Sequence, residues 1–133
     1  MDEATRKIVT DVTRDSDEER STFPEVVGRL IAAGVERYHM DMVRSERVFY
    51  MPDGTSESVS TDKYPPAAQS FLAKEVDAAV RAIQGDEIQY LEFCRRITQA
   101  GCVGYHVFIA GKRVVYYGRT GEQHVEYFPG AKP

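Results

Sequence analysis

Three histidines are the residues of this chain whose type most readily supports acid–base chemistry. They are His39, His106 and His124, the only histidines among the 133 residues. A neutral imidazole can take up or release a proton near pH 7, and a nearby tyrosine hydroxyl or carboxylate can orient a ligand. Tyr50, Tyr117 and Glu126 are candidates for that second role. Whether these side chains can act together depends on the elements that carry them.

The sequence contains two copies of one segment. With an offset of 67 positions and no gap, residues 23–54 align with residues 90–121. The aligned window holds nine identical pairs, where about two are expected by chance. These pairs are Glu25/Glu92, Arg29/Arg96, Ala33/Ala100, Gly34/Gly101, Tyr38/Tyr105, His39/His106, Val48/Val115, Tyr50/Tyr117 and Gly54/Gly121. We therefore predict a single domain over residues 1–133 made of two repeats, about 1–62 and 67–129, that bury a shared face against each other.

Each repeat is predicted to contain two helices followed by a three-stranded meander. Helical periodicity covers residues 2–16 and 67–84, and further helices are expected over residues 22–34 and 87–100. Alternating patterns then predict strands at residues 35–43, 46–51, 55–60, 103–109, 113–117 and 122–128. The predicted fold class is α+β, an internally duplicated helix-helix-β-meander unit with pseudo-two-fold symmetry and an antiparallel sheet packed on helices.

The predicted hairpin turns fix which side chains share a face of the sheet. Two-residue turns at 111–112 and 120–121 would place His106 opposite Tyr117 and Tyr117 opposite His124. Glu126 would lie in the adjacent row. A turn at 44–45 would likewise place His39 opposite Tyr50. The candidate ligand-binding residues are therefore His39, Tyr50, His106, Tyr117, His124 and Glu126, all on the more polar face.

This row of histidines and tyrosines has more than one interpretation. It could form a shallow polar groove for a ligand, or it could be the amphipathic outer face of a half-solvated sheet. Its aromatic content is also typical of a modest interface. No metal site or cofactor is predicted, because His106 and His124 would lie two strands apart, about 9.6 Å. A phosphate-binding glycine loop and a nucleophile elbow are both missing from the sequence.

Composition narrows the classes of partner. The net charge is −4, and residues 1–66 carry 9 basic and 14 acidic side chains, which argues against nucleic acid. Apolar runs of membrane-spanning length and an export signal after Met1 are both missing, so we expect a cytoplasmic protein without a membrane partner. Cys94 and Cys102 are expected to be buried thiols in that reducing compartment.

Several runs carry a family resemblance. AAGVERYHMD, RVFYMPDG and FCRRITQAGCVGYHVFIAGKRVVYYGRTGEQHVEYFP resemble the YdfO-like family of small bacterial and prophage-borne proteins, sometimes labelled phage envelope protein. The resemblance covers residues 23–129 and implies a shared fold, while it implies no catalytic residues.

Two hypotheses for function follow from the sequence. The first is a non-enzymatic binding or interaction module that uses the polar face of its sheet to bind an unknown protein or to form a homodimer. The alternative is a small-molecule-binding sensor or enzyme with a His/Tyr/Glu site. An enclosed concave site around those side chains would favour the alternative, and an open sheet face would favour the first.

Overall fold

Four helices and six strands make up the chain in a computed structural model, which describes residues 1–131. The helices are α1 (Glu3–Asp17), α2 (Phe23–Ala33), α3 (Ala73–Gln84) and α4 (Tyr90–Gln99). The strands are β1 (Arg37–Asp41), β2 (Glu46–Tyr50), β3 (Ser56–Ser60), β4 (Cys102–Phe108), β5 (Arg113–Gly118) and β6 (Gln123–Tyr127). The α+β fold class is confirmed, and the strands of the two halves begin and end at positions close to 67 residues apart.

The ends of α2 show how local sequence sets a helix. The Thr22 hydroxyl accepts a hydrogen bond from the Glu25 amide, and the Glu25 carboxylate accepts one from the Thr22 amide. This capping box satisfies two amides that the first helical turn leaves without partners. Gly34 ends the helix with a φ of +81°, a left-handed conformation that favours glycine. The helix expected from the sequence is therefore confirmed at both ends.

Helix α3 is shorter than its periodicity predicts. Residues 67–72 were expected to be helical, but the helix begins at Ala73. The amides of Ala68 and Leu72 instead donate to the carbonyls of Thr98 and Ala100, at the end of α4. The Thr98 carbonyl also accepts from the Gly101 amide, so the extended segment adds partners to carbonyls at the C-terminal end of α4.

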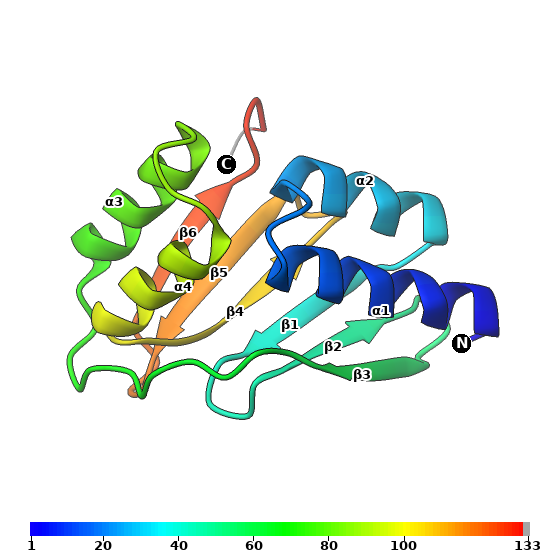
Figure 1. Cartoon of the computed structure of the whole chain (residues 1–133), viewed down its shortest axis with the longest axis horizontal. Helices are drawn as coiled ribbons and strands as arrows, with labels where there is room; N and C mark the ends of the chain where they lie inside the picture. The colour runs from blue at the N-terminus through cyan, green and yellow to red at the C-terminus, as the bar shows by residue number, and fades with distance from the viewer. Residues whose placement is uncertain (132–133) are drawn as a thin grey trace.

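The strands form one antiparallel sheet in the order β3-β2-β1-β4-β5-β6. Each half contributes a meander, and the two meanders meet where β1 pairs with β4. His39 lies directly opposite His106 in that pairing. These residues are one of the identical pairs 67 positions apart, and their strands lie side by side in the middle of the sheet (Figure 1).

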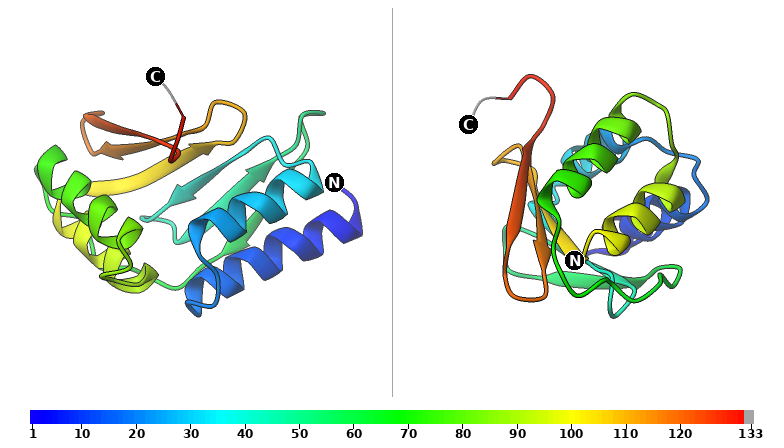
Figure 2. Two further views of the ribbon diagram at one scale, coloured as in Figure 1. Left: turned by 90° about the horizontal axis from the view of Figure 1, so that it is seen from above. Right: turned by 90° about the vertical axis from the view of Figure 1, so that its left-hand side faces the viewer.

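All four helices of the described chain lie on one side of the sheet (Figure 2). The apolar side chains between the two layers form the core, with Leu30, Met40, Phe49, Ile97 and Val107 almost fully buried. The residues that point into this core have even numbers in β1 and β5 and odd numbers in β2 and in β4 from Tyr105 onward, as alternation predicts. The opposite face of the sheet is left without a helical layer.

The hairpin loops differ from those expected, and this changes the strand register. Phe108 pairs with Arg113 and Asp41 pairs with Glu46, so each of these loops has four residues rather than two. His106 therefore lies opposite Val115, and His39 lies opposite Val48. The predicted pairings of these histidines with tyrosines are wrong by two residues, a shift that leaves the face unchanged.

The loop between β5 and β6 has three residues, because the Gly118 amide donates to the Glu122 carbonyl. Gly121 occupies its last position with a φ of +87°, as three-residue hairpin loops commonly require. Tyr117 consequently pairs with Gln123, and His124 pairs with the buried Tyr116. A shift of one residue turns every side chain of a strand to the opposite face, so the predicted placement of β6 is wrong.

Candidate functional site

The face of the sheet that carries no helix has an aromatic and imidazole centre. At that centre lie His39 on β1, His106 and Phe108 on β4, and Tyr117 on β5. All four side chains are partly exposed. Other residues on this face are Arg37, Asp41, Glu46, Val48, Tyr50, Arg113, Val115, Val125 and Tyr127, together with serines of β3. We refer to this surface as the open face.

The two histidines of the open face are stacked. Their ring centroids lie 4.2 Å apart, with an angle of 14° between the planes. The Tyr117 ring lies 5.4 Å from the His106 ring and 5.8 Å from the His39 ring. The pairing of β1 with β4 therefore brings the two aligned histidines into contact, and Tyr117 on β5 packs beside both.

Tyr117 reaches His39 because Gly104 lies between their strands. The Tyr117 hydroxyl is 2.6 Å from Nε2 of His39. A Cβ at position 104 would lie 2.5 Å from that hydroxyl and 2.7 Å from the Met40 carbonyl oxygen. Any larger residue at position 104 would clash with the tyrosine.

Burial shifts the pKa values of His39, His106 and Tyr117. It lowers the pKa of His39, although Asp41 and Glu46 act in the opposite direction. Burial also lowers the pKa of His106, and the neighbouring His39 and Arg37 lower it further. Burial raises the pKa of Tyr117 to about 12. Both imidazoles are therefore neutral at pH 7, and one hydrogen bond joins the Tyr117 hydroxyl to Nε2 of His39.

The first repeat lacks the same arrangement, although Tyr50 is the counterpart of Tyr117. Arg37 occupies the position equivalent to Gly104 and its guanidinium lies 4.0 Å from the centroid of the Tyr50 ring. This cation–π contact holds Tyr50 beside Arg37. Tyr50 thus lies on the open face as predicted, but its partner is an arginine rather than a histidine.

His124 and Glu126 lie on the other face of the sheet, next to α3. His124 Nε2 is 3.4 Å from Oδ1 of Asp77, and Arg81 contacts the Glu126 carboxylate. The structure therefore separates these two residues from His106 and Tyr117, which corrects the predicted row. The sequence reasoning missed Asp77 and Arg81. The sequence signal for this contact is Gly121. A three-residue loop that ends at this glycine places His124 and Glu126 on the face that α3 covers.

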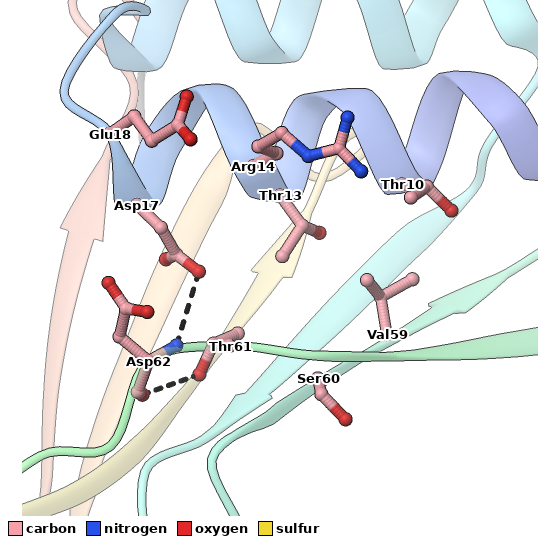
Figure 3. Close-up of a pocket in the computed structure, with 9 residues that line it drawn as sticks. All are labelled: Thr10, Thr13, Arg14, Asp17, Glu18, Val59, Ser60, Thr61 and Asp62. Carbon is pink, nitrogen blue, oxygen red and sulfur yellow. Dashed lines mark hydrogen bonds between the residues drawn. The ribbon is translucent and has the colours of Figure 1, made fainter.

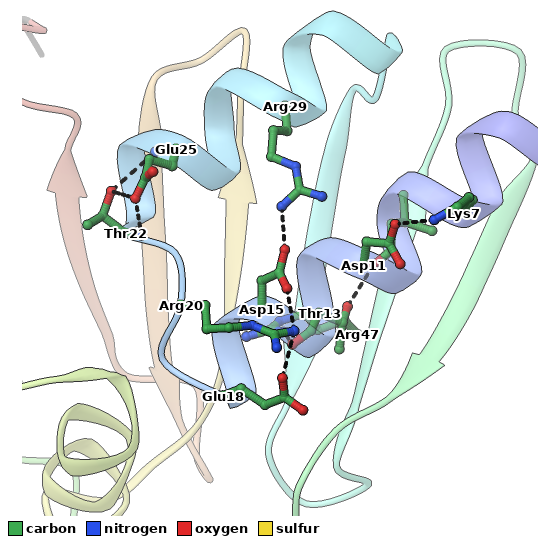
Figure 4. Close-up of polar contacts among 11 residues, drawn as sticks. Lys7, Asp11, Thr13, Asp15, Glu18, Arg20, Thr22, Glu25, Arg29 and Arg47 are labelled. Atoms are coloured by element: carbon green, nitrogen blue, oxygen red, sulfur yellow. Dashed lines mark hydrogen bonds and ion pairs between the residues drawn. The ribbon is translucent and has the colours of Figure 1, made fainter.

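A buried arginine is the second feature that was missed. Arg47 on β2 is 3% exposed and donates to the Tyr90 hydroxyl at 2.6 Å. It also donates to the Thr13 carbonyl at 3.4 Å (Figure 4). The Asp17 carboxylate lies 3.9 Å away, and burial raises its pKa while Arg47 opposes that shift. Strand alternation places Arg47 on the same face as Phe49, so the pattern already indicated an inward arginine.

Two shallow pockets lie away from the open face. The first, of about 280 Å³, lies between α1 and the end of β3 and includes Thr10, Arg14 and Val59 in its lining (Figure 3). The second, of about 350 Å³, is lined by residues 62–65 together with part of α4. Neither pocket is lined by a histidine, so neither encloses the predicted His/Tyr/Glu site.

The fold and the open face together define an α+β domain with one helical layer and one uncovered sheet face. Residues 15–126 match the model of the family DUF1398, described as a protein of unknown function. That match spans most of the chain, so the chain belongs to the DUF1398 family. A search of curated proteins gives no match.

Within residues 1–131, no helix has the length and apolar character needed to cross a bilayer.

Cys94 and Cys102 are buried free thiols, and burial raises the pKa of Cys94 to about 12 and that of Cys102 to about 11. Their expected burial is confirmed, and thiols that remain protonated are poor nucleophiles.

Proposed function

We propose that this chain is an interaction module that pairs with a second copy of itself through the open face of its sheet. The observation that carries the proposal is the placement of all four helices on one side, which leaves the aromatic centre of the other side without a covering layer. An isologous pair would use the same patch on both subunits.

The composition of the open face is that of an interface. Its centre combines the stacked His39 and His106 with Phe108, Val115 and Tyr117. The β3 margin carries serines, whereas the β6 margin carries Gln123 together with Val125 and Tyr127. Enrichment in aromatic residues at the centre is typical of a protein interface.

The charges of the open face favour self-association. Its strand residues include two arginines, Arg37 and Arg113, and two carboxylates, Asp41 and Glu46. The chain as a whole carries a net charge of −4. The open face is thus balanced while the rest of the molecule is acidic, so two copies would meet with least repulsion through this face.

The size of the open face is also adequate. Six strands about 4.8 Å apart, with five residues each at about 3.4 Å per residue, give a projected area on the order of 500 Å². Side-chain relief makes the accessible area larger, and a standard interface needs roughly 800 Å² per partner. A dimer that covers this face would therefore fall at the small end of specific interfaces.

The alternative hypothesis of a sensor or enzyme has weaker support. Chemistry on a small molecule needs a site that excludes water around convergent polar groups. His39, His106 and Tyr117 lie on an open surface, and His124 and Glu126 lie behind the sheet. The five residues cannot act on one substrate.

The test is the mass of the protein in solution by light scattering on a sizing column. We expect twice the chain mass of 15.0 kDa. Val115→Lys places a charge at the centre of the open face and should yield the monomer with unchanged circular dichroism. Ile31→Lys is the matched control, because Ile31 is 58% exposed on α2 and outside the open face. A wild-type monomer at all concentrations would refute the proposal.

We also propose a bacterial cytosolic setting for this module, as the resemblance to the prophage-borne YdfO-like proteins suggests. Two buried cysteines kept as free thiols support a reducing compartment. The acidic surface supports a partner other than nucleic acid.

A further inference from the structure

A cluster of potential metal ligands lies between α3 and β6, apart from the open face and independent of its proposed function. Asp77 comes from the helix, and His124 and Glu126 come from the edge strand. One ligand atom from each residue lies within 4.8 Å of the other two. His124 Nε2 is 3.4 Å from Oδ1 of Asp77 and 3.7 Å from Oε1 of Glu126.

These separations are close to those of a metal coordination shell. Zinc binds imidazole nitrogen and carboxylate oxygen at about 2.1 Å in a tetrahedron, whose corners are then about 3.4 Å apart. One imidazole and two carboxylates also form a ligand set that divalent transition ions accept. Small rotations of Glu126 and Asp77 would complete three corners of the tetrahedron.

The imidazole nitrogen of His124 is the second observation that indicates a ligand. Nε2 is buried and makes no hydrogen bond to any residue in the described part of the chain. Its side chain is 20% exposed, whereas that of Asp77 is 45% exposed. A buried polar atom without a partner is costly. A metal ion entering past Asp77 would satisfy this nitrogen.

Arg81 occupies the cluster in the structure. Its guanidinium contacts the Glu126 carboxylate and lies 3.4 Å from Oδ1 of Asp77. The Arg81 side chain is 52% exposed, so it can turn into solvent with little loss. Arg81 thus supplies the positive charge that the two carboxylates require when no metal ion is bound.

The first repeat lacks this ligand set at the equivalent positions. An offset of 67 relates Asp77 to Thr10, His124 to Glu57 and Glu126 to Val59. Only one of those three residues can bind a metal ion. The cluster is therefore specific to the second repeat and is not a product of the repeated sequence.

We propose that Asp77, His124 and Glu126 form a binding site for a divalent transition metal ion such as Zn²⁺, and that Arg81 competes with the ion for the two carboxylates. Three protein ligands leave a fourth position for water or a further ligand. Binding requires displacement of Arg81, which makes the site weaker than it would be without the arginine.

Calorimetric titration of the full chain with Zn²⁺ tests the proposal. We expect one ion per chain. His124→Ala should weaken binding at least tenfold, and Arg81→Ala should strengthen it several-fold because the competing cation is gone. His106→Ala is the matched control, since it removes a histidine from the open face, and it should bind as the wild type does.

A second readout is the visible absorption of bound Co²⁺, which reports ligand geometry directly. Its intensity should fall to that of the free ion in His124→Ala and remain in His106→Ala. Absence of Zn²⁺ binding to the wild type would overturn the proposal. Loss of binding in His106→Ala with retention in His124→Ala would also overturn it, because the ion would then lie on the open face.

Discussion

The hydroxyl of Tyr117 lies 2.6 Å from Nε2 of His39, two strands away across Gly104. This contact joins the two halves of the sheet, where His39 also stacks on His106. Its counterpart in the first repeat does not form, because Arg37 replaces glycine and holds Tyr50. The centre of the open face is thus asymmetric although the fold around it is symmetric.

Tyr117→Phe should reduce stability modestly. The variant removes the hydroxyl that shares a hydrogen bond with His39, and such a bond contributes about 0.5–1.5 kcal/mol to the free energy of unfolding. Urea denaturation measures the change. Tyr50→Phe is the control, because the Tyr50 ring is held by Arg37 rather than through its hydroxyl, and it should shift the free energy by less than about 0.5 kcal/mol. Equal losses in both variants would contradict the assigned hydrogen bond.

Gly104→Ala should destabilise the protein by about 2–3 kcal/mol, as overpacking in a rigid environment does. The added Cβ would lie 2.5 Å from the Tyr117 hydroxyl and 2.7 Å from the Met40 carbonyl. Because one of these neighbours is backbone, the double variant with Tyr117→Ala should recover only part of the loss. Thermal denaturation compares the three proteins.

The control for this change is Gly28→Ala. A Cβ at Gly28 meets no atom within 4 Å, and the residue lies in α2. Alanine is preferred over glycine within a helix by up to about 1 kcal/mol. Gly28→Ala should therefore raise the melting temperature, while Gly104→Ala lowers it. A neutral Gly104→Ala would mean that the two central strands can separate without cost.

Arg47→Ala should be among the most damaging single changes in the chain. Removing one member of a buried ionic cluster costs about 3–5 kcal/mol, because the remaining polar groups lose their partner. Here the Tyr90 hydroxyl and the Asp17 carboxylate would be left in the core. Arg47→Met, which fills the same space, should cost less than Arg47→Ala. Chemical denaturation gives the values.

Arg44→Ala is the matched control for that prediction. Arg44 is 70% exposed by side chain and pairs with Glu46 at 2.9 Å. Surface ion pairs contribute about 0–1 kcal/mol, so the variant should remain close to the wild type. A small effect of Arg47→Ala would show that water takes the place of the guanidinium.

The fold class and the order of helices and strands could be predicted from the sequence, because the signals for each element are local and occur twice. The capping residues Thr22 and Glu25, the stop at Gly34 and the alternation of β4 each predict one element, and the offset of 67 doubles that information. Loop length was not predictable in this way. Gly111-Lys112 and Thr120-Gly121 both resemble two-residue turns, yet the loops that contain them have four and three residues.

The errors in loop length also explain why only part of the candidate site was predicted. A shift of two residues kept His39 and His106 on the open face, whereas a shift of one residue moved His124 and Glu126 behind the sheet. Contacts across strands that do not neighbour each other, such as that of Tyr117 with His39, depend on the small residue between them. No local pattern indicates such a contact.

Acidification should destabilise the protein through the two stacked histidines. Burial lowers the pKa values of both His39 and His106 below the ordinary value of 6.5, so the unfolded chain binds protons first as the pH falls. The free energy of unfolding is then unaffected by this pair above about pH 7.5 and falls as the pH decreases through 6. Two protonated rings 4.2 Å apart would also repel each other.

Urea denaturation between pH 8 and pH 5 measures this dependence. The double variant His39→Gln, His106→Gln should lose less stability over that range than the wild type, since glutamine does not titrate. His124→Gln is the control, because it removes a histidine from the other face of the sheet, and it should keep the dependence that the stacked pair gives. If the double variant and the wild type follow the same curve, the stacked histidines bind protons as readily in the folded chain as in the unfolded one.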